Sequence, residues 1–522
     1  MRKIKAFLFI TVSVCIFLFL PKDAHACILM YAGGNFTDDG GNLFIRTEEI
    51  YADSNKLYYV SPAGKRKKGE VYRGCFGFRW TFTHDSYRYT ARRDDNLSGP
   101  CRNCGSTHDH TPFEEAGTND HGVTVSATQS IDPNARIAET DPFTREGITE
   151  SEITTILLSE ASTAREGVEI LLGIYDRSGA GEEGSGVMIC DRNEQWYVEN
   201  LSGHQYLAVL LPPGAAFMQF NVSVLGEIDL NDTAHVIASE NLISTAQKAG
   251  TFVGNAEKNI IDFRRSYNDY TGENADEELL QLIPERLAVS LNYLNGTDRW
   301  TTENVLEDND YIMKNIDENG NITALHNRLA LKNRMSLEDV LAVFRLDPIG
   351  YGDNVNTHLY RFYPEKEETL GTVEWSTMDN TRYNVFIPCY PMLLTNTWEG
   401  YKVPLADETV TEERPDAGDF YRKEGKYHVF PAGWERSYIG TLSALSALMN
   451  YGELDREQIE SAGSRLRQLQ EAFIRRFAVL SEQIASEPSP DVREKIMTQA
   501  DMEMASRVHD LALSIYREYS SK

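Results

Sequence analysis

A cysteine directly behind a short apolar leader is the feature that most constrains this chain. Residues 1–26 begin with three basic residues, Arg2, Lys3 and Lys5, and continue into an almost wholly apolar run. The segment ends in Ala-His-Ala before Cys27, which is the small-x-small pattern of a signal-peptide cleavage site. We therefore predict that residues 1–26 are removed, that the mature chain starts at Cys27, and that the protein is exported to the periplasm or the extracellular space.

A mature chain that starts at Cys27 would carry a thiol and a free α-amine on the same residue. An α-amine has an unperturbed pKa of about 7.7–8.0, so near neutral pH a part of it is an unprotonated base. A thiol is a strong nucleophile, and an adjacent base activates it further. A nucleophile that carries its own base is the arrangement of N-terminal-nucleophile (Ntn) hydrolases, and we predict this role for Cys27.

A lipid anchor is the alternative role for a cysteine that follows a signal peptide. Lipidation sites normally have an aliphatic residue three positions before the cysteine and small residues between, whereas this chain has Ala24, His25 and Ala26. His25 fits that pattern poorly. A lipid-anchored binding protein without catalytic activity stays open as the alternative, non-enzymatic function. The apolar run is shorter than the roughly 20 residues that a membrane span needs, so we expect no membrane span.

The charge balance argues against polyanionic partners. The whole chain has a net charge of −28, and removal of residues 1–26 would leave 47 basic and 78 acidic residues. Such an excess of carboxylates repels nucleic acid and anionic membrane surfaces, so we predict no nucleic-acid partner. The chain has no Gly-x-Ser-x-Gly and no His-Glu-x-x-His motif. We expect neither a cofactor nor a catalytic metal, and the sequence leaves open whether the chain forms a homo-oligomer.

Five cysteines remain when Cys27 and the leader cysteine are set aside. Disulfides form in exported proteins, and an odd number means that at least one of the five thiols stays unpaired. Cys101 and Cys104 form a Cys-x-x-Cys followed by two histidines, which also has a zinc-like spacing. We favour a disulfide or unpaired thiols here because no second Cys-x-x-Cys accompanies the first, and a metal site stays open.

The pattern of apolar residues and turns predicts a layered α+β domain. A short apolar run from Cys27, a turn at 37–41 and a second strand at 43–48 predict a hairpin. Capping boxes that start at Thr149 and Thr163 predict two helices, and further strands follow them. Strands, helices and strands again are typical of sheets covered by helices. Towards the end of the chain, the apolar periodicity predicts one helix that includes 466–484, a break at two prolines, and a last helix over about 492–519.

A set of short motifs in chain order carries a family resemblance. The motifs are Cys27, Thr37-x-Asp-Gly40, Arg46-Thr-Glu-Glu49, Gly117-Thr-Asn-Asp-His-Gly-Val123, Ser126-Ala-Thr128, Glu160-Ala-Ser-Thr-Ala-Arg-Glu166, Trp196-Tyr-Val-Glu199, Ser202-Gly-His204 and Gly371-Thr-Val-Glu-Trp375. Together they resemble the dipeptidase A and secernin family of cysteine Ntn hydrolases, which is distantly similar to penicillin V acylase and bile-salt hydrolase. The resemblance covers most of residues 27–400.

This resemblance implies a fold and an activity. The expected fold is the four-layer αββα sandwich of Ntn hydrolases over residues 27–435, with a helical C-terminal region over 436–522. The expected activity is that of an exported cysteine exopeptidase that hydrolyses dipeptides. An amidase that acts on N-acyl amides is the close alternative, so the partner we expect is a dipeptide or another small amide.

The resemblance also implies roles for particular residues. Cys27 would be the nucleophile, Arg46 would favour its thiolate, and Glu49 would hold the α-amine. Asn119 and Asn221 would donate hydrogen bonds to the oxyanion of the reaction. Three of these residues also have a plain structural interpretation: a strand-end cation for Arg46, a turn residue for Asn119 and a loop residue for Asn221.

One motif departs from the family pattern, and the roles of two further residues, Glu199 and His204, stay open. The family usually has Arg-Asn-x-Asp where this chain has Arg46-Thr47-Glu48-Glu49. Thr47 lacks the amide and Glu49 is one methylene longer than aspartate, so the departure bears on substrate preference and rate. Glu199 and His204 either shape the substrate pocket or are satisfied residues of the core.

Overall fold

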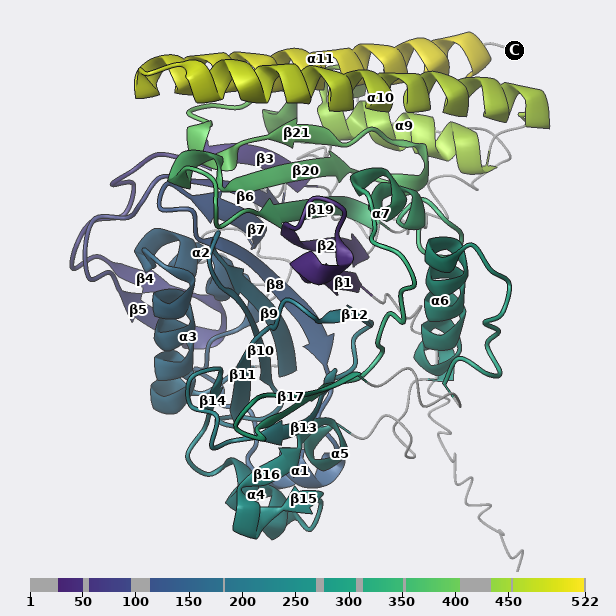
Figure 1. Cartoon of the computed structure of the whole chain (residues 1–522). Helices are drawn as coiled ribbons and strands as arrows, with labels where there is room; N and C mark the ends of the chain where they lie inside the picture. Colours follow the sequence, from purple (N-terminus) through teal and green to yellow (C-terminus); the bar gives the residue numbers. More distant parts are fainter. Residues whose placement is uncertain are drawn as a thin grey trace, which may run out of the picture.

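The computed structural model describes most of the chain (Figure 1). The predicted leader, residues 1–26, and the Cys101–Cys104 pair lie outside the described residues. The described ranges are 27–49, 56–94, 113–181, 184–268, 277–306, 313–350, 354–403, 433–451 and 454–520.

Two antiparallel sheets form the centre of the molecule. The six-stranded sheet has the order β12 (Ala216–Gln219), β1 (Ile28–Ala32), β2 (Asn42–Glu49), β19 (Asn354–Phe362), β20 (Thr372–Met378) and β21 (Ile387–Cys389). The eight-stranded sheet has the order β14 (Val236–Ala238), β11 (Tyr206–Leu210), β10 (Gln195–Asn200), β9 (Gly184–Cys190), β8 (Thr124–Ile131), β7 (Glu114–Asn119), β6 (Tyr89–Asp94) and β3 (Lys56–Ser61).

Two smaller sheets and ten α-helices accompany the large sheets among the described residues, besides short 3-10 helices. The smaller sheets are β15 (Gly254–Asn255), β16 (Ile260–Asp262), β13 (Leu225–Asp229), β18 (Ile322–Leu325) and β17 (Met313–Ile316), and the pair β4 (Val71–Arg73) and β5 (Arg79–Thr81). The helices are α1 (Ala135–Thr140), α2 (Glu150–Glu160), α3 (Ala164–Ser178), α4 (Leu242–Ala249), α5 (Phe263–Tyr267), α6 (Glu277–Asn295), α7 (Leu337–Val343), α9 (Tyr438–Tyr451), α10 (Arg456–Ser486) and α11 (Pro490–Ser520).

The two large sheets stack face to face and carry helices on both outer faces (Figure 1). Leu29 and Phe44 of the six-stranded sheet share a buried cluster with Met188 and Val209 of the eight-stranded sheet. A second cluster joins α2 and α3 to the eight-stranded sheet, and a third joins α6, α7, α9, α10 and α11 to the six-stranded sheet. This layer order confirms the predicted four-layer αββα sandwich.

The alternation of side chains along β2 decides which residues face the second sheet. Phe44 lies in the cluster between the sheets, whereas Leu43 and Ile45 lie in the cluster under the helices. Because successive side chains of a strand point to opposite faces, Arg46 and Glu48 follow Phe44 towards the eight-stranded sheet. Thr47 and Glu49 follow Ile45 towards the helices.

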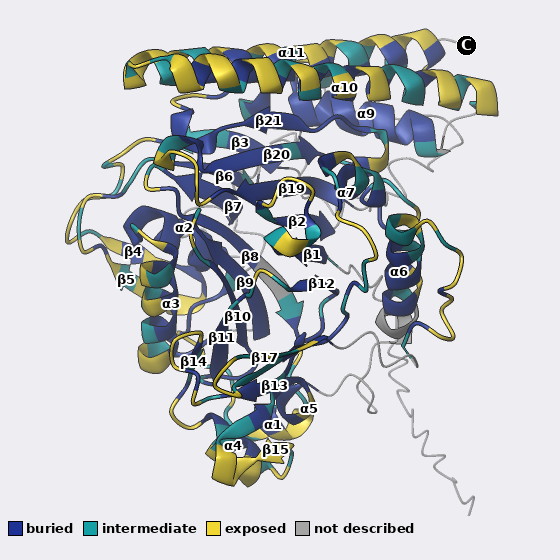
Figure 2. Ribbon diagram, viewed as in Figure 1, coloured by how far each residue is buried: buried dark blue, intermediate teal, exposed yellow. Residues whose placement is uncertain are grey.

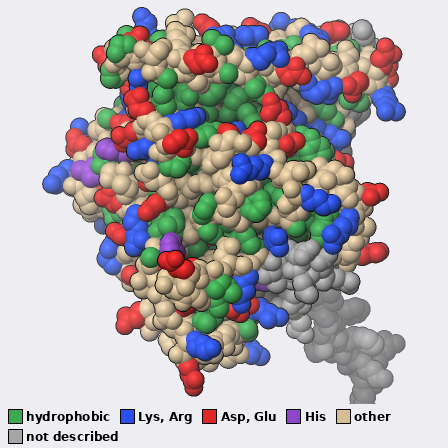
Figure 3. Space-filling model, in the orientation of Figure 1, with side chains coloured by type: hydrophobic (Ala, Val, Ile, Leu, Met, Phe, Trp, Pro, Cys, Tyr) green, Lys and Arg blue, Asp and Glu red, His purple; other side chains and the backbone are tan. Residues whose placement is uncertain are grey.

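The C-terminal helices follow the predicted periodicity. The capping residue Asp455 starts α10, and its buried side chains include the whole predicted stripe: Leu466, Leu469, Phe473, Phe477, Leu480 and Ile484. The helix ends at Ser486, before the two prolines, and α11 starts at Pro490. Figure 2 shows the buried sides of α10 and α11 turned to the body of the protein, and Figure 3 shows charged side chains along their outer sides.

The two predicted helices after β8 also form, with one difference at their starts. Thr149 and Glu152 make the complete capping box of α2. Thr163 caps α3 by accepting a hydrogen bond from the Glu166 N–H, but the Glu166 carboxylate accepts from the backbone and hydroxyl of Ser162 instead of closing the box. No helix among the described residues is long and apolar enough to cross a membrane.

Candidate active site

The first hairpin of the described chain brings Cys27 next to Arg46. Strands β1 and β2 pair antiparallel with Leu29 opposite Arg46 and Ile28 opposite Thr47, so Cys27 lies beside the end of β2. The Cys27 Sγ is 3.6 Å from the Arg46 Nη2 and 3.5 Å from the backbone nitrogen of Glu49. The structure therefore brings together three of the predicted site residues.

The Arg46 guanidinium is buried between the sheets and not exposed at a strand end. Its Nη1 donates to the Glu115 carboxylate of β7 at 2.5 Å and to the Ala127 carbonyl of β8 at 3.2 Å. Only 1% of Arg46 is exposed, which excludes the plain reading of a cation in solvent. A buried, paired guanidinium is a fixed positive charge beside the thiol.

Burial sets the protonation state of the Cys27 thiol. Removal from water raises the pKa of this thiol to about 12, and the Arg46 cation and the Glu49 N–H only partly oppose that rise. The expectation that Arg46 favours the thiolate has the right direction, but burial outweighs the cation. The raised pKa favours the protonated form of this partly exposed thiol near neutral pH, so attack needs a base that takes the proton.

The Glu49 carboxylate is held from three elements. Its Oε2 accepts from the Arg286 guanidinium of α6 at 2.8 Å, and its Oε1 accepts from the Asn354 amide of β19 at 3.2 Å and the Thr47 hydroxyl at 3.3 Å. The same Thr47 oxygen accepts from the Ile28 N–H at 3.1 Å, next to Cys27. Thr47 thus links the nucleophile's strand to the longer acidic side chain.

We expect the Arg286–Glu49 pair to be a large contributor to stability. Both side chains are 2% exposed, and removal of one partner of a buried ion pair leaves an unpaired charge that costs about 3–5 kcal/mol. Arg286→Gln should lower the free energy of unfolding by about that amount in urea titrations. Lys314→Gln is the matched control, because its pair with Glu227 is about 40% exposed and should contribute less than about 1 kcal/mol. Equal losses in the two variants would contradict this prediction.

A buried polar cluster lies behind Arg46, between the two sheets. Lys56 Nζ contacts Glu48 and Asp94, each at 2.7 Å, and the Asn356 amide donates to both Glu48 and Glu115. Burial and the nearby Glu115 charge raise the pKa of Glu48 well above its ordinary value. The cluster fixes Glu115, and through it the Arg46 guanidinium.

Asn221 lies just beyond the edge strand that pairs with the strand of the nucleophile. Strand β12 pairs antiparallel with β1 as far as Gln219 opposite Leu29, and Asn221 and Cys27 each lie two residues beyond this pair. The backbone of Asn221 is in the left-handed region at φ 54°, which is rare for a residue other than glycine. Such a conformation turns the chain sharply at this point.

The structure gives Asn119 another role than the predicted one. Its side-chain amide donates to the carbonyls of Leu158 and Ala161 at the end of α2, at 3.1 and 2.7 Å. Its backbone N–H donates to the Val123 carbonyl at 2.9 Å. Since these bonds occupy its donors, Asn119 closes a turn against α2, and the oxyanion role predicted for it is corrected here.

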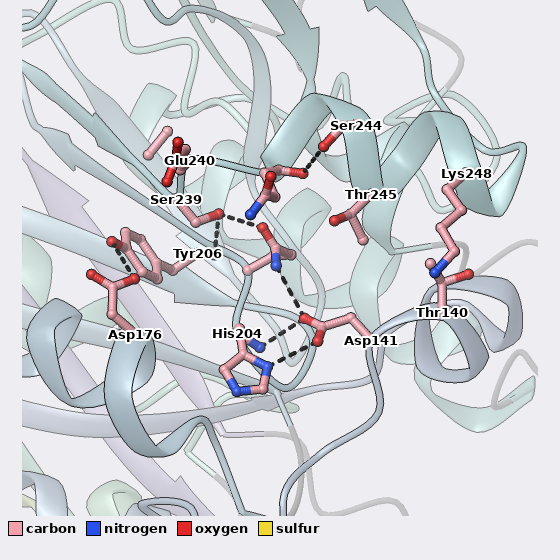
Figure 4. A pocket seen from close by; sticks show the side chains of 13 residues that line it. Thr140, Asp141, Asp176, His204, Tyr206, Ser239, Glu240, Ser244, Thr245 and Lys248 are labelled. Carbon is pink, nitrogen blue, oxygen red and sulfur yellow. Dashed lines mark hydrogen bonds and ion pairs between the residues drawn. The ribbon is translucent and has the colours of Figure 1, made fainter.

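His204 lines a separate polar pocket, and Glu199 is a core residue. The pocket has a volume of about 950 Å³ and lies among α1, β11 and α4 (Figure 4). There the His204 Nδ1 is 2.9 Å from the Asp141 carboxylate, and Figure 4 shows both at the pocket wall. Glu199 is fully buried and accepts hydrogen bonds from Ser223 and Val224.

The described cysteines and acidic residues form no metal site. Cys190 and Cys389 are buried free thiols, which confirms that at least one thiol stays unpaired. Within the described ranges, no three His, Cys, Asp or Glu side chains are arranged to hold a metal ion. The disulfide and metal alternatives for Cys101 and Cys104 stay open.

Sequence reasoning missed the residues that hold the site. Glu115, Arg286 and Asn354 lie 69, 237 and 305 residues from their partners, and no local pattern marks them. The one available signal was that buried charges need partners, which says that partners exist but not where they are.

Comparisons with known proteins show which family the chain resembles. The model of peptidase family C69 matches residues 26–276, a range that includes Cys27, Arg46 and Asn221. "Probable dipeptidase B" of Streptococcus pyogenes serotype M1 is 30% identical over 391 residues, which are 73% of this chain and 75% of that protein. "Probable dipeptidase" of Salmonella dublin is 34% identical over 248 residues, 47% of this chain and 53% of that protein.

A solved structure, penicillin V acylase from Agrobacterium tumefaciens, is 10% identical, covers 70% of this chain and 85% of its own, and has a TM-score of 0.28. The family assignment therefore depends on the sequence relatives and not on this structure. The similarity to the Streptococcus pyogenes protein extends over most of both chains. The chain belongs to peptidase family C69.

Proposed function

We propose that this protein is an exported cysteine dipeptidase whose nucleophile is Cys27 after removal of residues 1–26. The observation that carries the proposal is the position of the Cys27 thiol between the Arg46 guanidinium and the Glu49 N–H. The family assignment and the dipeptidase names of two relatives support peptide bonds of short substrates as the target. The expected signal peptide supports export.

The α-amine of Cys27 is the base in this mechanism. It takes the Sγ proton, directly or through a water, while Sγ attacks the scissile carbonyl carbon and the carbonyl oxygen becomes an oxyanion. The resulting ammonium gives its proton to the leaving amine, and the C–N bond breaks to leave a thioester. The amine then takes a proton from water, the hydroxide attacks the thioester, and the acid product leaves with restoration of the thiol.

The remaining site residues support this cycle by charge and position. The Arg46 cation lowers the pKa of the thiol against the effect of burial. In this proposal Glu49 orients the α-amine. The oxyanion needs donors about 3 Å away, and we assign this role to Asn221, which follows the strand paired with the strand of Cys27. Asn119 has no part in it because its donors are occupied.

A panel of small substrates tests the proposed activity. The mature enzyme should hydrolyse dipeptides with a free amino terminus and should leave the same dipeptides unhydrolysed when they are N-acylated. N-acyl amino acids serve as the second set. Hydrolysis of the N-acyl set alone would favour the amidase alternative and contradict a dipeptidase.

The mass of the mature protein tests the processing. Cleavage before Cys27 without modification should give the mass of residues 27–522. An increase by acyl chains would identify a lipid anchor with a blocked amine, and it would contradict the proposed mechanism.

Arg46→Gln should move the acid limb of the kcat/KM profile to higher pH, by roughly one unit. A nearby cation disfavours a protonated amine, so its removal raises the pKa of the α-amine and the enzyme needs a higher pH to be active. The acid limb of Arg46→Lys should lie between those of the wild type and Arg46→Gln, because lysine keeps the charge but lacks the planar guanidinium group. The profile of kcat/KM against pH measures this shift.

Arg92→Gln is the matched control for this prediction. Arg92 is also buried between the sheets and is paired with Glu374, so its loss should destabilise the fold in a similar way. The acid limb of the kcat/KM profile of Arg92→Gln should stay at the pH of the wild type. An unshifted limb in Arg46→Gln would reduce Arg46 to a structural residue.

A further inference from the structure

One buried carboxylate holds the segment that follows Asn221. Glu199 of β10 accepts from the Val224 N–H at 2.8 Å with its Oε1, and it accepts from the Ser223 hydroxyl with its Oε2. Glu199 is fully buried, so water does not compete for either bond. The carboxylate therefore fixes the chain two and three residues after Asn221.

Other side chains complete the hold on the same segment. The Gln219 amide donates to the Val222 carbonyl at 3.3 Å, and the Asn268 side-chain oxygen accepts from the Ser223 N–H at 3.0 Å. Asn268 is anchored in turn through its own amide to the Asp132 carbonyl at 2.7 Å. Residues 222–224 are thus bonded one by one to fixed side chains.

These bonds matter because Asn221, directly before the bonded segment, has an unusual backbone conformation. Asparagine tolerates the left-handed region better than most residues, but the conformation still carries some strain and is kept by the surrounding structure. Strained backbone of this kind is common where a group must be aimed at a reacting atom. On the C-terminal side of Asn221, the bonds to residues 222–224 are the contacts that impose its backbone conformation.

We propose that Glu199 is a positioning residue of the reaction: by holding Ser223 and Val224, it fixes Asn221 where the oxyanion develops. The inference rests on the proposed function, which assigns the oxyanion to Asn221. Glu199 itself touches neither the substrate nor Cys27 in this role. Its effect should therefore appear in the rate of the chemical step and not in substrate affinity.

The charge of Glu199 should change within the working pH range. Burial raises the pKa of Glu199 to about 7, although the bonds from Ser223 and Val224 and the Arg264 cation of α5 oppose that rise. Tyr197 of the same strand and His326 after β18 are the other titratable groups facing this region. Burial lowers the pKa of His326 to about 3, so His326 is neutral. A protonated Glu199 has one acceptor oxygen fewer and holds the segment less well.

The test compares Glu199→Gln with Asp191→Asn in the mature enzyme. Asp191 is a fair control because its carboxylate also accepts from backbone N–H groups, but these belong to Ala164, Asn193 and Glu194, outside residues 220–224. We expect Glu199→Gln to lower kcat on a dipeptide roughly tenfold or more at pH 8, with KM changed less than about threefold. Asp191→Asn should leave both constants near those of the wild type.

The pH dependence separates positioning from a general loss of stability. Glutamine resembles the protonated acid, so the ratio of wild-type to Glu199→Gln kcat should fall towards one between pH 8 and pH 5.5. The limb of the α-amine is common to both proteins and cancels in this ratio. The rate of Cys27 alkylation by iodoacetamide should be unchanged, because alkylation forms no oxyanion.

Each result has a defined meaning. A Glu199→Gln enzyme as active as Asp191→Asn, or a kcat ratio that is constant with pH, overturns the positioning role. Ser223→Ala is the second variant if Glu199→Gln does not fold; it removes one of the two bonds and should lower kcat with little change in KM. A wild-type enzyme that hydrolyses no dipeptide overturns the proposed function, and with it this inference.

Discussion

Replacement of Cys27 by alanine should abolish dipeptide hydrolysis while the protein stays folded. The variant has no nucleophile, and loss of a catalytic nucleophile typically lowers kcat by roughly a thousandfold or more. Cys27 directly precedes β1, where alanine fits the same backbone, so the free energy of unfolding should change by about 1 kcal/mol or less. Cys27→Ser should keep at most a trace of activity, because a hydroxyl is the poorer nucleophile beside the same base. Initial rates and a urea titration measure both effects.

Cys389→Ala is the control for this prediction. Cys389 is another cysteine, but it is a free thiol buried in the cluster under the C-terminal helices. Its truncation should lower stability through lost packing and leave the rate of hydrolysis near that of the wild type. Full activity in Cys27→Ala would remove the central element of the proposed mechanism.

A blocked α-amine should also inactivate the enzyme. A chain that keeps residues 1–26, or carries a tag before Cys27, has an amide nitrogen at this residue, and an amide is not a base. Since burial keeps the thiol protonated, with its pKa raised to about 12, no thiolate is ready to replace the missing base. We expect kcat/KM to fall roughly a thousandfold or more, as it does when a base that activates a nucleophile is lost.

A protease site that ends directly before Cys27 allows this to be measured in one preparation. Activity should be absent before cleavage and should rise in proportion to the fraction of cleaved chain. The same protein with Cys27→Ala should stay inactive after cleavage, which excludes a contribution from the added protease. An uncleaved chain that hydrolyses dipeptides at the normal rate would show that the α-amine is not the base.

The sequence by itself determined the features that depend on neighbours along the chain. Cys27 and Arg46 belong to one hairpin with a short turn, so the register that pairs their strands follows from local pattern. The Thr149 capping box and the apolar stripe of α10 depend on spacings of three and four residues within one helix. The motifs were sufficient for the family, because they occur in the family's order.

The tertiary structure alone decided which partners these residues have. Arg46 lies against Glu115, and Glu49 lies against Arg286 and Asn354, because other strands and a helix pack at those places. The ends of helices need donors for their last carbonyls, and α2 takes both amide hydrogens of Asn119 for this purpose. A spacing in the sequence carries no information about such contacts.

The protonation of the nucleophile was likewise decided by tertiary structure. A cysteine beside an arginine in water would have a lowered pKa, and from the sequence we expect only that the charge of Arg46 favours the thiolate. In the folded chain, burial raises the pKa of Cys27 by more than the Arg46 cation lowers it. The physical reason is that a sequence names the charges that are present, whereas their effect depends on distance and on access to water, which only the packed layers fix.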